Sequence, residues 1–374
     1  MRDEYWFIRV TNYESQFERI DMHSLYAIIL AGGQGTRLWP LTAKEIPKAF
    51  LSFDRTGISL LQRTISRVSQ LTSHERIIIV AGQSHEKELH LHTQDVPDEN
   101  VILEPTGRGT LSCIGLAALY VKRKDPSSIM IVMPGEQLIK DNKAFQQVIT
   151  EAAKSAQKYN CVVTLGIKPT FPATRFGYIN IGEKVSSSGD VPVFKSMGFT
   201  EKPDEKMASE FVSSGKYFWN SGIYVFPTLL LLNMISEFAP DVYDNLSEIE
   251  TCIGTPDEKK AIDRVYPNMR NISIDYAVME KSSNMLIIPA DMDWNDMGTW
   301  TEVAETWESD EKSNACFGKY ITMDSSGCII YSPEKLVAMI GIHDVIIVDT
   351  PNGILICAKD RADDVKVLVK NINQ

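Results

Sequence analysis

The sequence predicts an α/β domain followed by a small, mostly β module. Short apolar segments alternate with amphipathic ones over the first 310 residues, which is the pattern of alternating strands and helices. A glycine-rich loop directly follows the first apolar segment, at the place where open α/β sheets bind their ligands. From residue 311 onward the segments become short and β-rich, and Gly and Asp turns separate them.

The α/β part is expected to open with a buried strand at residues 25–30. This apolar run ends at a group of glycines, which is typical of a buried strand that leads into a loop. Apolar residues then recur at helical spacing or in short runs. The predicted order is a helix at 60–71, a strand at 77–80, a helix at 114–120, a strand at 129–133, a helix at 145–159, a polar turn at 186–190 between two extended segments, a helix at 206–212 and a longer irregular helix at 234–249.

The C-terminal module is expected to be all β until a last helix. Its predicted strands are 320–322, 328–331, 336–340, 345–348 and 354–357, and the helix is 360–371. We therefore divide the chain into an N-terminal extension (1–21), a main domain (22–310) and the module (311–374). No catalytic role is expected for the extension.

Composition favours a soluble enzyme. With 374 residues and 44% apolar content, the chain can bury one large core and a smaller module. No apolar run approaches the roughly 18 residues of a membrane helix, and charges interrupt the N-terminal residues where a signal peptide would be apolar. We expect a cytoplasmic protein without a membrane partner. A net charge of −11 argues against nucleic acid as a partner.

Cysteines and histidines give no sign of a metal site. The six cysteines show no C-x-x-C pair and no zinc spacing, so we expect reduced, mostly buried side chains. His85, His90 and His92 fall close together, but the surrounding charged residues are typical of a solvated helix edge.

The loop at residues 31–40 indicates a binding site for a polyphosphate. Gly32, Gly33 and Gly35 let the backbone approach a bulky anion, because no Cβ is in the way and a positive φ costs little. Arg37 adds a fork of donors that suits phosphate oxygens.

Two commoner glycine-rich loops do not fit this spacing. A Walker A loop needs Gly-Lys-Ser/Thr after its second glycine, whereas Gly35 is followed by Thr36 and Arg37. A dinucleotide fingerprint opens a helix, whereas Pro40 stops any helix within about a turn. Asp54 lies at about the distance expected of a ribose-binding acid, but it sits in a polar turn.

The continuation of the loop points to a family. Residues 35–41 read Gly-Thr-Arg-Leu-Trp-Pro-Leu, and Ile-Pro-Lys-Ala-Phe follows at 46–50. This pattern resembles the signature of the sugar-nucleotide pyrophosphorylases, and within them that of the mannose-1-phosphate guanylyltransferases (GDP-mannose pyrophosphorylases). Four further blocks fit the same family in the same order, at residues 199–203, 218–226, 273–281 and 294–300.

The resemblance implies a fold and a reaction. The fold would be a Rossmann-like nucleotidyltransferase, with a mixed, mostly parallel sheet, helices on both faces and a left-handed β-helix-like C-terminal domain. The reaction would make GDP-mannose and pyrophosphate from GTP and α-D-mannose 1-phosphate by in-line transfer with Mg²⁺. The sugar phosphate is already an anion near neutral pH, since its second pKa is about 6, so no general base is needed. The protein has to hold two anions together and neutralise the charge on the leaving pyrophosphate.

The same resemblance implies roles for particular residues. The catalytic residues would be Arg37, Lys48 and Lys202. The nucleotide-binding residues would be Gly32, Gly33, Gly35, Thr36, Glu104 and Arg108. The sugar hydroxyls would face Glu201, Asn220 and Asp275. A carboxylate such as Glu104 can accept hydrogen bonds from guanine N1–H and N2–H₂. The alternative for Glu104 is a purely structural role, as a capping or salt-bridged acid near Arg108. The alternative for Lys48 and Lys202 is that each is a solvated lysine beside a proline turn.

The metal site departs from the family pattern. In relatives, the segment that corresponds to residues 134–137 resembles Pro-Ala-Asp-His, and its Asp binds Mg²⁺. In this chain Glu136 stands in place of that Asp. The second acid is intact as Asp296, and we expect the two carboxylates to share one ion, with Asp141 as a second candidate. The extra methylene moves the carboxylate by roughly 1.5 Å, and displacement on that scale can cost about 10²-fold in rate. The block at 108–112 departs as well, with Gly109 where relatives have Asn.

Two alternatives remain open, and these departures suggest the second. The chain could transfer a nucleotide to another sugar 1-phosphate, such as a heptose or glucose derivative. It could also be a non-catalytic subunit that binds a sugar nucleotide and regulates a partner, although the intact Lys48, Lys202 and Asp296 argue against that. A homodimer is compatible with each of these hypotheses.

Overall fold

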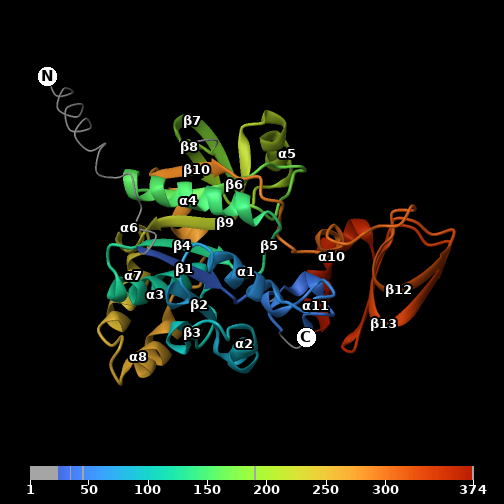
Figure 1. Cartoon of the computed structure of the whole chain (residues 1–374), viewed down its shortest axis with the longest axis horizontal. Helices are drawn as coiled ribbons and strands as arrows, with labels where there is room; N and C mark the ends of the chain where they lie inside the picture. The colour runs from blue at the N-terminus through green and yellow to red at the C-terminus, as the bar shows by residue number, and fades with distance from the viewer. Residues whose placement is uncertain (1–23, 34, 44–45, 189–190, 373–374) are drawn as a thin grey trace.

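The computed structural model describes residues 24–33, 35–43, 46–188 and 191–372 (Figure 1). The predicted extension 1–21 lies outside these residues. Within them, one nine-stranded sheet forms the main domain and a four-stranded sheet forms the C-terminal module. The strands of the large sheet, in spatial order, are β3 (Val101–Glu104), β2 (Ile77–Gly82), β1 (Leu25–Leu30), β4 (Ile129–Pro134), β9 (Tyr217–Pro227), β6 (Val162–Ile167), β10 (Met285–Pro289), β8 (Val191–Thr200) and β7 (Tyr178–Ser188).

The sheet is mixed, as expected. Strands β3, β2, β1 and β4 run parallel to one another, and β10 runs parallel to β6. Strand β9 is antiparallel to both β4 and β6, and β7 and β8 form an antiparallel pair at the far edge. The parallel half brings the carboxyl ends of β1 and β4 together, which is where the glycine loop begins.

Helices cover both faces of the sheet because each central strand is apolar on both sides. In β1, Leu25, Ala27 and Ile29 pack on one face, whereas Tyr26 and Ile28 pack on the other. The first face is covered by α1 (Leu60–Val68), α2 (Glu86–His92) and α4 (Asn142–Tyr159). The second is covered by α3 (Gly109–Lys124), α6 (Thr228–Phe238), α7 (Pro240–Glu250), α8 (Glu258–Val265) and α9 (Ile274–Ala277).

Two predicted elements differ from the structure. The single helix expected at 234–249 is divided between α6 and α7, because Pro240 starts a new helix and Ala239 before it leaves the helical conformation (φ −145°). Of the turn expected at 186–190, residues 186–188 belong to β7, and residues 189–190 lie outside the described part of the chain. Helix α5 (Glu205–Ser214) is confirmed near the position expected for it.

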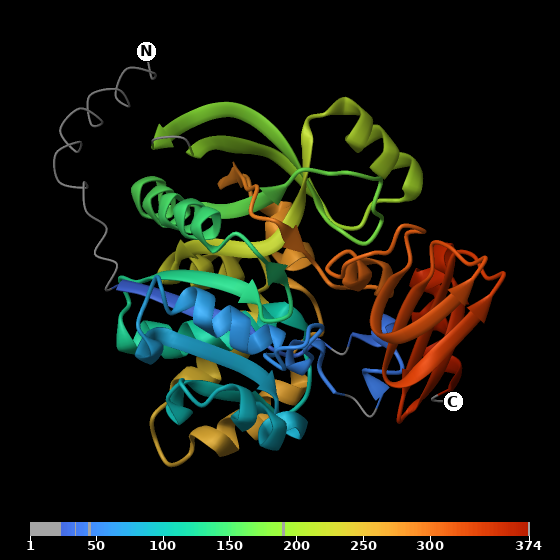
Figure 2. The same ribbon diagram turned by 45° about the vertical axis from the view of Figure 1, so that its right-hand side comes forward.

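The C-terminal module contains four strands and a final helix. They are β12 (Ala315–Met323), β13 (Ile329–Ile340), β14 (Val345–Thr350), β15 (Gly353–Ala358) and α11 (Val365–Ile372), with the 3₁₀ helix η10 (Lys359–Asp364) before α11. Two of the predicted strands, 328–331 and 336–340, are parts of the one long strand β13, which pairs in parallel with both β12 and β14. Figure 2 shows the module, orange to red, beside the blue segment that follows β1.

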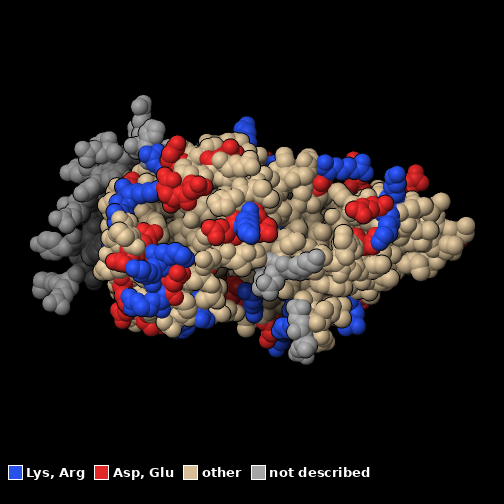
Figure 3. Space-filling model, turned by 90° about the horizontal axis from the view of Figure 1, so that it is seen from below, with Lys and Arg blue, Asp and Glu red and all other residues tan. Residues whose placement is uncertain are grey.

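A two-stranded sheet and a short helix connect the main domain to the module. Strand β5 (Leu138–Ile139) pairs with β11 (Trp294–Asn295), and α10 (Trp300–Ala304) follows. In the described part of the chain, no helix combines the length and apolar character needed to cross a membrane. On the face seen in Figure 3, Lys and Arg side chains are interspersed with Asp and Glu.

Candidate active site

The glycine loop lies against side chains from other parts of the fold. Gly35 has a left-handed backbone (φ 58°), and a Cβ there would lie only 2.9 Å from the Cβ of Lys48. A Cβ on Gly33 would collide with the carboxylate of Glu136. Gly35 is required for its left-handed backbone and for this close approach, whereas a side chain at position 33 would displace the Glu136 carboxylate.

Two adjoining cavities open beside this loop, and Pro134 lines both. The first, which we call the loop cavity, has a volume of 290 Å³. The second, which we call the polar cavity, has a volume of 240 Å³. Of the residues predicted from the sequence, those that line the loop cavity are Gly32, Gly33, Glu104 and Glu136. Those that line the polar cavity are Arg37, Glu201, Lys202, Asn220, Asp275 and Asp296.

Lys48 links the acidic groups of the two cavities. Its side chain is buried (3% exposed), and its Nζ lies 3.4 Å from Oε1 of Glu136 and donates to the carbonyl oxygen of Asp296 at 2.8 Å. Burial by itself lowers the pKa of a lysine, but the charges of Glu136 and Asp296 outweigh it and raise the pKa of Lys48 above its ordinary 10.5. Lys48 is therefore a fixed positive charge and not a solvated lysine.

The residues present fit a divalent cation held partly by its substrate. Oε2 of Glu136 is buried and has no hydrogen-bond partner within the described residues. Asp296 supplies a second carboxylate from the segment after β11. The described residues contain no group of three or more His, Cys, Asp or Glu side chains that could hold a metal by themselves. Two carboxylates are the usual protein share of a Mg²⁺ site that is completed by waters and phosphates. Asp141, in contrast, caps α4 by accepting from the amide of Ala144.

The polar cavity contains a connected set of hydrogen-bonding groups. Tyr224 Oη and Asn220 Nδ2 both donate to Oδ1 of Asp275, at 2.5 and 3.1 Å. Glu201 pairs with Lys202; burial and the charge of Asp275 nevertheless raise the pKa of Glu201 above 4.5. Lys202 has a positive φ (48°), a strained conformation for a lysine that is often found at functional sites.

Glu104 lies at the other end of the site, in the loop cavity. It is 7% exposed and accepts hydrogen bonds from Tyr266 Oη and from the Cys113 thiol, so within the described residues its partners are these two side chains and not Arg108. Burial raises the pKa of Glu104 above 4.5, although the bond from Tyr266 opposes the shift. Among the described residues, Arg108 and Thr36 line neither cavity.

The departure at Gly109 has a structural reason. Gly109 has a positive φ (75°), and a Cβ there would collide with the backbone of Ile272. The first turn of α3 therefore packs directly on the segment that leads into α9, and only glycine fits this spacing.

Among the lining residues of the polar cavity that were not identified from the sequence are Arg175, Gln137 and Trp294. The Arg175 guanidinium lies 4.8 Å from the ring centroid of Phe176 and pairs with Glu302. Oε1 of Gln137 and Nε1 of Trp294 are buried without hydrogen-bond partners in the described structure. Gln137 and Trp294 stand inside or beside motif blocks and could have been found there, whereas no motif marks Arg175.

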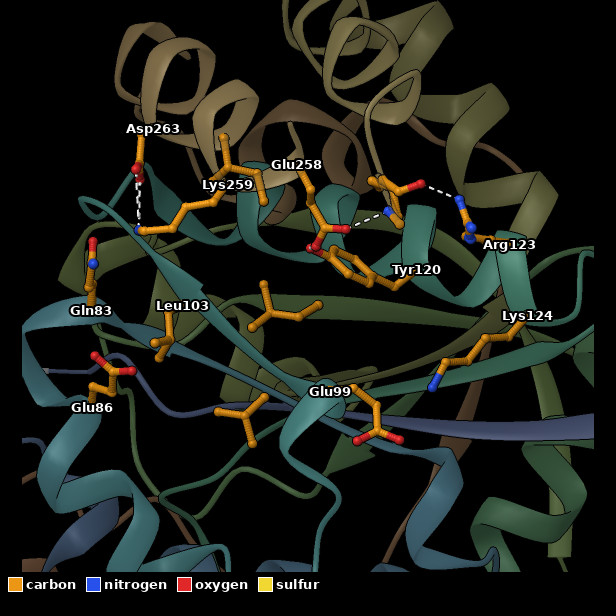
Figure 4. Close-up of a pocket in the computed structure, with 15 residues that line it drawn as sticks. Gln83, Glu86, Glu99, Leu103, Tyr120, Arg123, Lys124, Glu258, Lys259 and Asp263 are labelled. Carbon is orange, nitrogen blue, oxygen red and sulfur yellow. Dashed lines mark hydrogen bonds and ion pairs between the residues drawn. The ribbon is translucent and has the colours of Figure 1, made fainter. Parts of the chain in front are cut away.

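A third, larger cavity of 540 Å³ lies between β3, α3 and α8 and contains none of the predicted site residues (Figure 4). Its polar groups bond largely to one another. Glu258 Oε1 accepts a hydrogen bond from Tyr120 Oη at 2.5 Å, and Nζ of Lys259 lies 3.2 Å from Oδ2 of Asp263. None of its described side chains has a buried polar atom without a partner, in contrast to the polar cavity.

Known proteins resemble this chain along most of its length. The Nucleotidyl transferase family matches residues 26–313, and the MannoseP isomerase/GMP-like beta-helix domain matches residues 318–372. A mannose-1-phosphate guanylyltransferase of Escherichia coli is 36% identical over 357 residues, which are 93% of this chain and 76% of that protein. The alginate biosynthesis protein AlgA of Pseudomonas aeruginosa is 33% identical, with 92% of this chain and 72% of that protein covered.

A solved structure from Thermus thermophilus, described as a mannose-1-phosphate geranyltransferase, superposes with a TM-score of 0.83 at 28% identity. The match covers 94% of this chain and 100% of that one. Sequence and fold thus agree over both domains. The chain belongs to the mannose-1-phosphate guanylyltransferase family of nucleotidyltransferase enzymes and carries its β-helix-like C-terminal domain.

Proposed function

We propose that this enzyme transfers the guanylyl group of GTP to mannose 1-phosphate and releases pyrophosphate. The observation that carries the proposal is the pair of adjoining cavities, with the buried Lys48 between them. Lys48 pairs with the carboxylate of Glu136 from the loop cavity and donates to the backbone carbonyl of Asp296 from the polar cavity. The loop cavity suits the nucleotide, and the polar cavity suits a sugar phosphate. Relatives named mannose-1-phosphate guanylyltransferase support this choice of substrates.

The chemistry needs electrostatic help rather than a base. A phosphate oxygen of the sugar phosphate attacks the α-phosphorus of GTP in line, and the bond to the β-phosphate oxygen breaks as pyrophosphate leaves. Lys48 and Arg37 would stabilise the charge that develops on the phosphates. Gly32, Gly33 and Gly35 would leave room for them, with Thr36 beside these glycines.

Mg²⁺ is the cofactor that we propose, with Glu136 and Asp296 as its protein ligands. Bound there, the ion would neutralise phosphate charge and orient the reacting groups. The unpartnered Oε2 of Glu136 supports this assignment. The substrates would be positioned mainly by Lys48, Arg37 and the side chains that line the polar cavity.

The sugar would lie in the polar cavity. Lys202 would bind its phosphate, and Glu201, Asn220 and Asp275 would face its hydroxyl groups, which can donate to carboxylates and amide oxygens. The free Oε1 of Gln137 and Nε1 of Trp294 would add one acceptor and one donor. Buried polar groups without partners are costly, so a hydroxyl-rich ligand is the fitting occupant.

A substrate panel tests the proposal. Pyrophosphate release is measured with GTP, ATP, CTP and UTP against the 1-phosphates of mannose, glucose and a heptose. We expect the highest kcat/KM for GTP with mannose 1-phosphate. Clear preference for another nucleotide or another sugar 1-phosphate would assign a related nucleotidyl transfer with that substrate. Pyrophosphate release without any sugar phosphate would indicate a hydrolase. Binding of GDP-mannose without turnover would support a regulatory subunit instead.

Glu104 is expected to select guanine. A carboxylate can accept from both N1–H and N2–H₂, whereas a glutamine amide offers only one acceptor, so Glu104→Gln should lower kcat/KM for GTP by about 10- to 100-fold. Tyr266→Phe serves as the matched control, because it removes the hydrogen bond to Glu104 but leaves the carboxylate. An unchanged ratio of GTP to ATP activity in folded Glu104→Gln would remove Glu104 from base recognition.

The same residue predicts a pH effect. Because burial raises the pKa of Glu104, this carboxyl becomes protonated at a pH above the ordinary 4.5 as the solution is acidified. It then loses an acceptor, so the ratio of kcat/KM for GTP to that for ATP should fall with decreasing pH. The ratio cancels titration of the phosphates, which both nucleotides share. In Glu104→Gln the ratio should not change with pH.

A further inference from the structure

The C-terminal module packs directly on the second half of the glycine loop. Leu38 is fully buried in one apolar cluster with Ala362, Val365 and Val369 of the module. Next to it, the carbonyl oxygen of Trp39 accepts a hydrogen bond from Nε1 of Trp300 at 3.1 Å. The module therefore holds the loop segment on which Arg37 stands.

One carboxylate of the module reaches two arginines of the polar cavity. Oδ1 of Asp363, in η10, lies 3.0 Å from Nε of Arg37, and its Oδ2 lies 3.6 Å from Nη1 of Arg175. Arg175 also pairs with Glu302, whose Oε2 accepts from the amide of Gly298 at 2.8 Å. A chain of polar contacts thus runs from the C-terminal module to the segment that contains the metal-binding candidate, Asp296.

The ion pair with Asp363 is made at Nε, the inner nitrogen of the Arg37 guanidinium. Asp363 contacts Nε, so the two terminal nitrogens keep their donors for phosphate oxygens. An arginine side chain without such an anchor loses more rotamer entropy when it binds a phosphate. Two neighbouring guanidinium groups also repel each other, and a shared carboxylate offsets that repulsion.

We propose that Asp363 is a positioning residue for nucleotidyl transfer, by which the C-terminal module completes the active site. It acts through Arg37, with Arg175 as the second arginine that it holds in the polar cavity. The inference rests on the proposed function only for the class of reaction, not for the identity of base or sugar. Asp363 is about half exposed (55%), and exposed ion pairs contribute little to stability, so its effect should appear in kinetics and not in folding.

The test compares two adjacent aspartates in the full-length enzyme. Asp363→Asn keeps the size of the side chain and removes its charge. Asp364→Asn is the matched control, because Asp364 is equally exposed (54%) but pairs with Arg361, outside both cavities. Asp363→Glu restores the charge. Each variant is assayed for kcat, for KM of both substrates and for melting temperature, with the substrate pair that the wild-type enzyme prefers.

We expect Asp363→Asn to lower kcat by about 10- to 100-fold with little change in KM, since displacement of a catalytic group by about 1 Å can cost about 100-fold. Asp364→Asn should match the wild type, Asp363→Glu should recover most of the activity, and all three should melt alike. Equal kcat in the two asparagine variants overturns the proposal, and so does a higher kcat in Asp363→Asn. A different preferred substrate pair would change the proposed function and leave this comparison intact.

Discussion

Lys48→Met is expected to lose about 10²- to 10³-fold in kcat, with a smaller change in KM. The loss of one preorganised charge at a transition state has this magnitude. Lys48 is a buried cation that pairs with the Glu136 carboxylate and donates to the backbone carbonyl of Asp296. The raised pKa of Lys48 means that the charge is present throughout the working pH range. Steady-state kinetics with both substrates varied gives the separation between kcat and KM.

Two further variants make this result interpretable. Lys140→Met is the control variant. Lys140 pairs with Asp293, three residues before Asp296, but its side chain is half exposed, so this variant should keep wild-type turnover. Lys48→Arg keeps the charge that offsets Glu136 and should fold, yet its planar guanidinium cannot reproduce the ammonium position and kcat should still fall. Wild-type kcat in folded Lys48→Met would remove Lys48 from the mechanism.

The second large effect concerns the metal ligands. Glu136→Ala and Asp296→Ala should each reduce turnover on the order of 100-fold or more and weaken its dependence on Mg²⁺, because metal assistance is worth several kcal/mol. Glu136→Asp should keep or increase activity by restoring the shorter reach found in relatives. Turnover is followed during Mg²⁺ titration, before and after chelation of the wild-type enzyme.

Asp293→Ala is the matched control for these variants. Asp293 lies three residues before Asp296, is 63% exposed and pairs with Lys140, so its loss should leave the Mg²⁺ dependence unchanged. If the wild-type enzyme turns over well and Glu136→Ala equals it, Glu136 is not a ligand. No turnover of the wild type at any Mg²⁺ or Mn²⁺ concentration, together with GDP-mannose binding, would favour the regulatory subunit.

Much of the site could be predicted because its residues stand in short motifs. The loop at 31–40 contains glycines whose spacing has a direct steric meaning, and the blocks around Lys202, Asn220, Asp275 and Asp296 mark the polar cavity. What the motifs did not reveal is how the glycines are used. Gly33 and Gly35 make room for Glu136 and Lys48 as well as for any phosphate, and that follows only from side chains that lie far along the chain.

The α/β class, the β-rich C-terminal module and most strand positions can be predicted from local patterns, because burial on one or both faces leaves a periodic pattern within a few residues. The prediction of one helix at 234–249 was wrong although its cause is local, since Pro240 starts a new helix there. The contacts of Glu104 with Tyr266 and of Asp363 with Arg37 arise only when the chain folds. Such contacts join residues more than a hundred positions apart, and they depend on chain crossings that local periodicity does not encode.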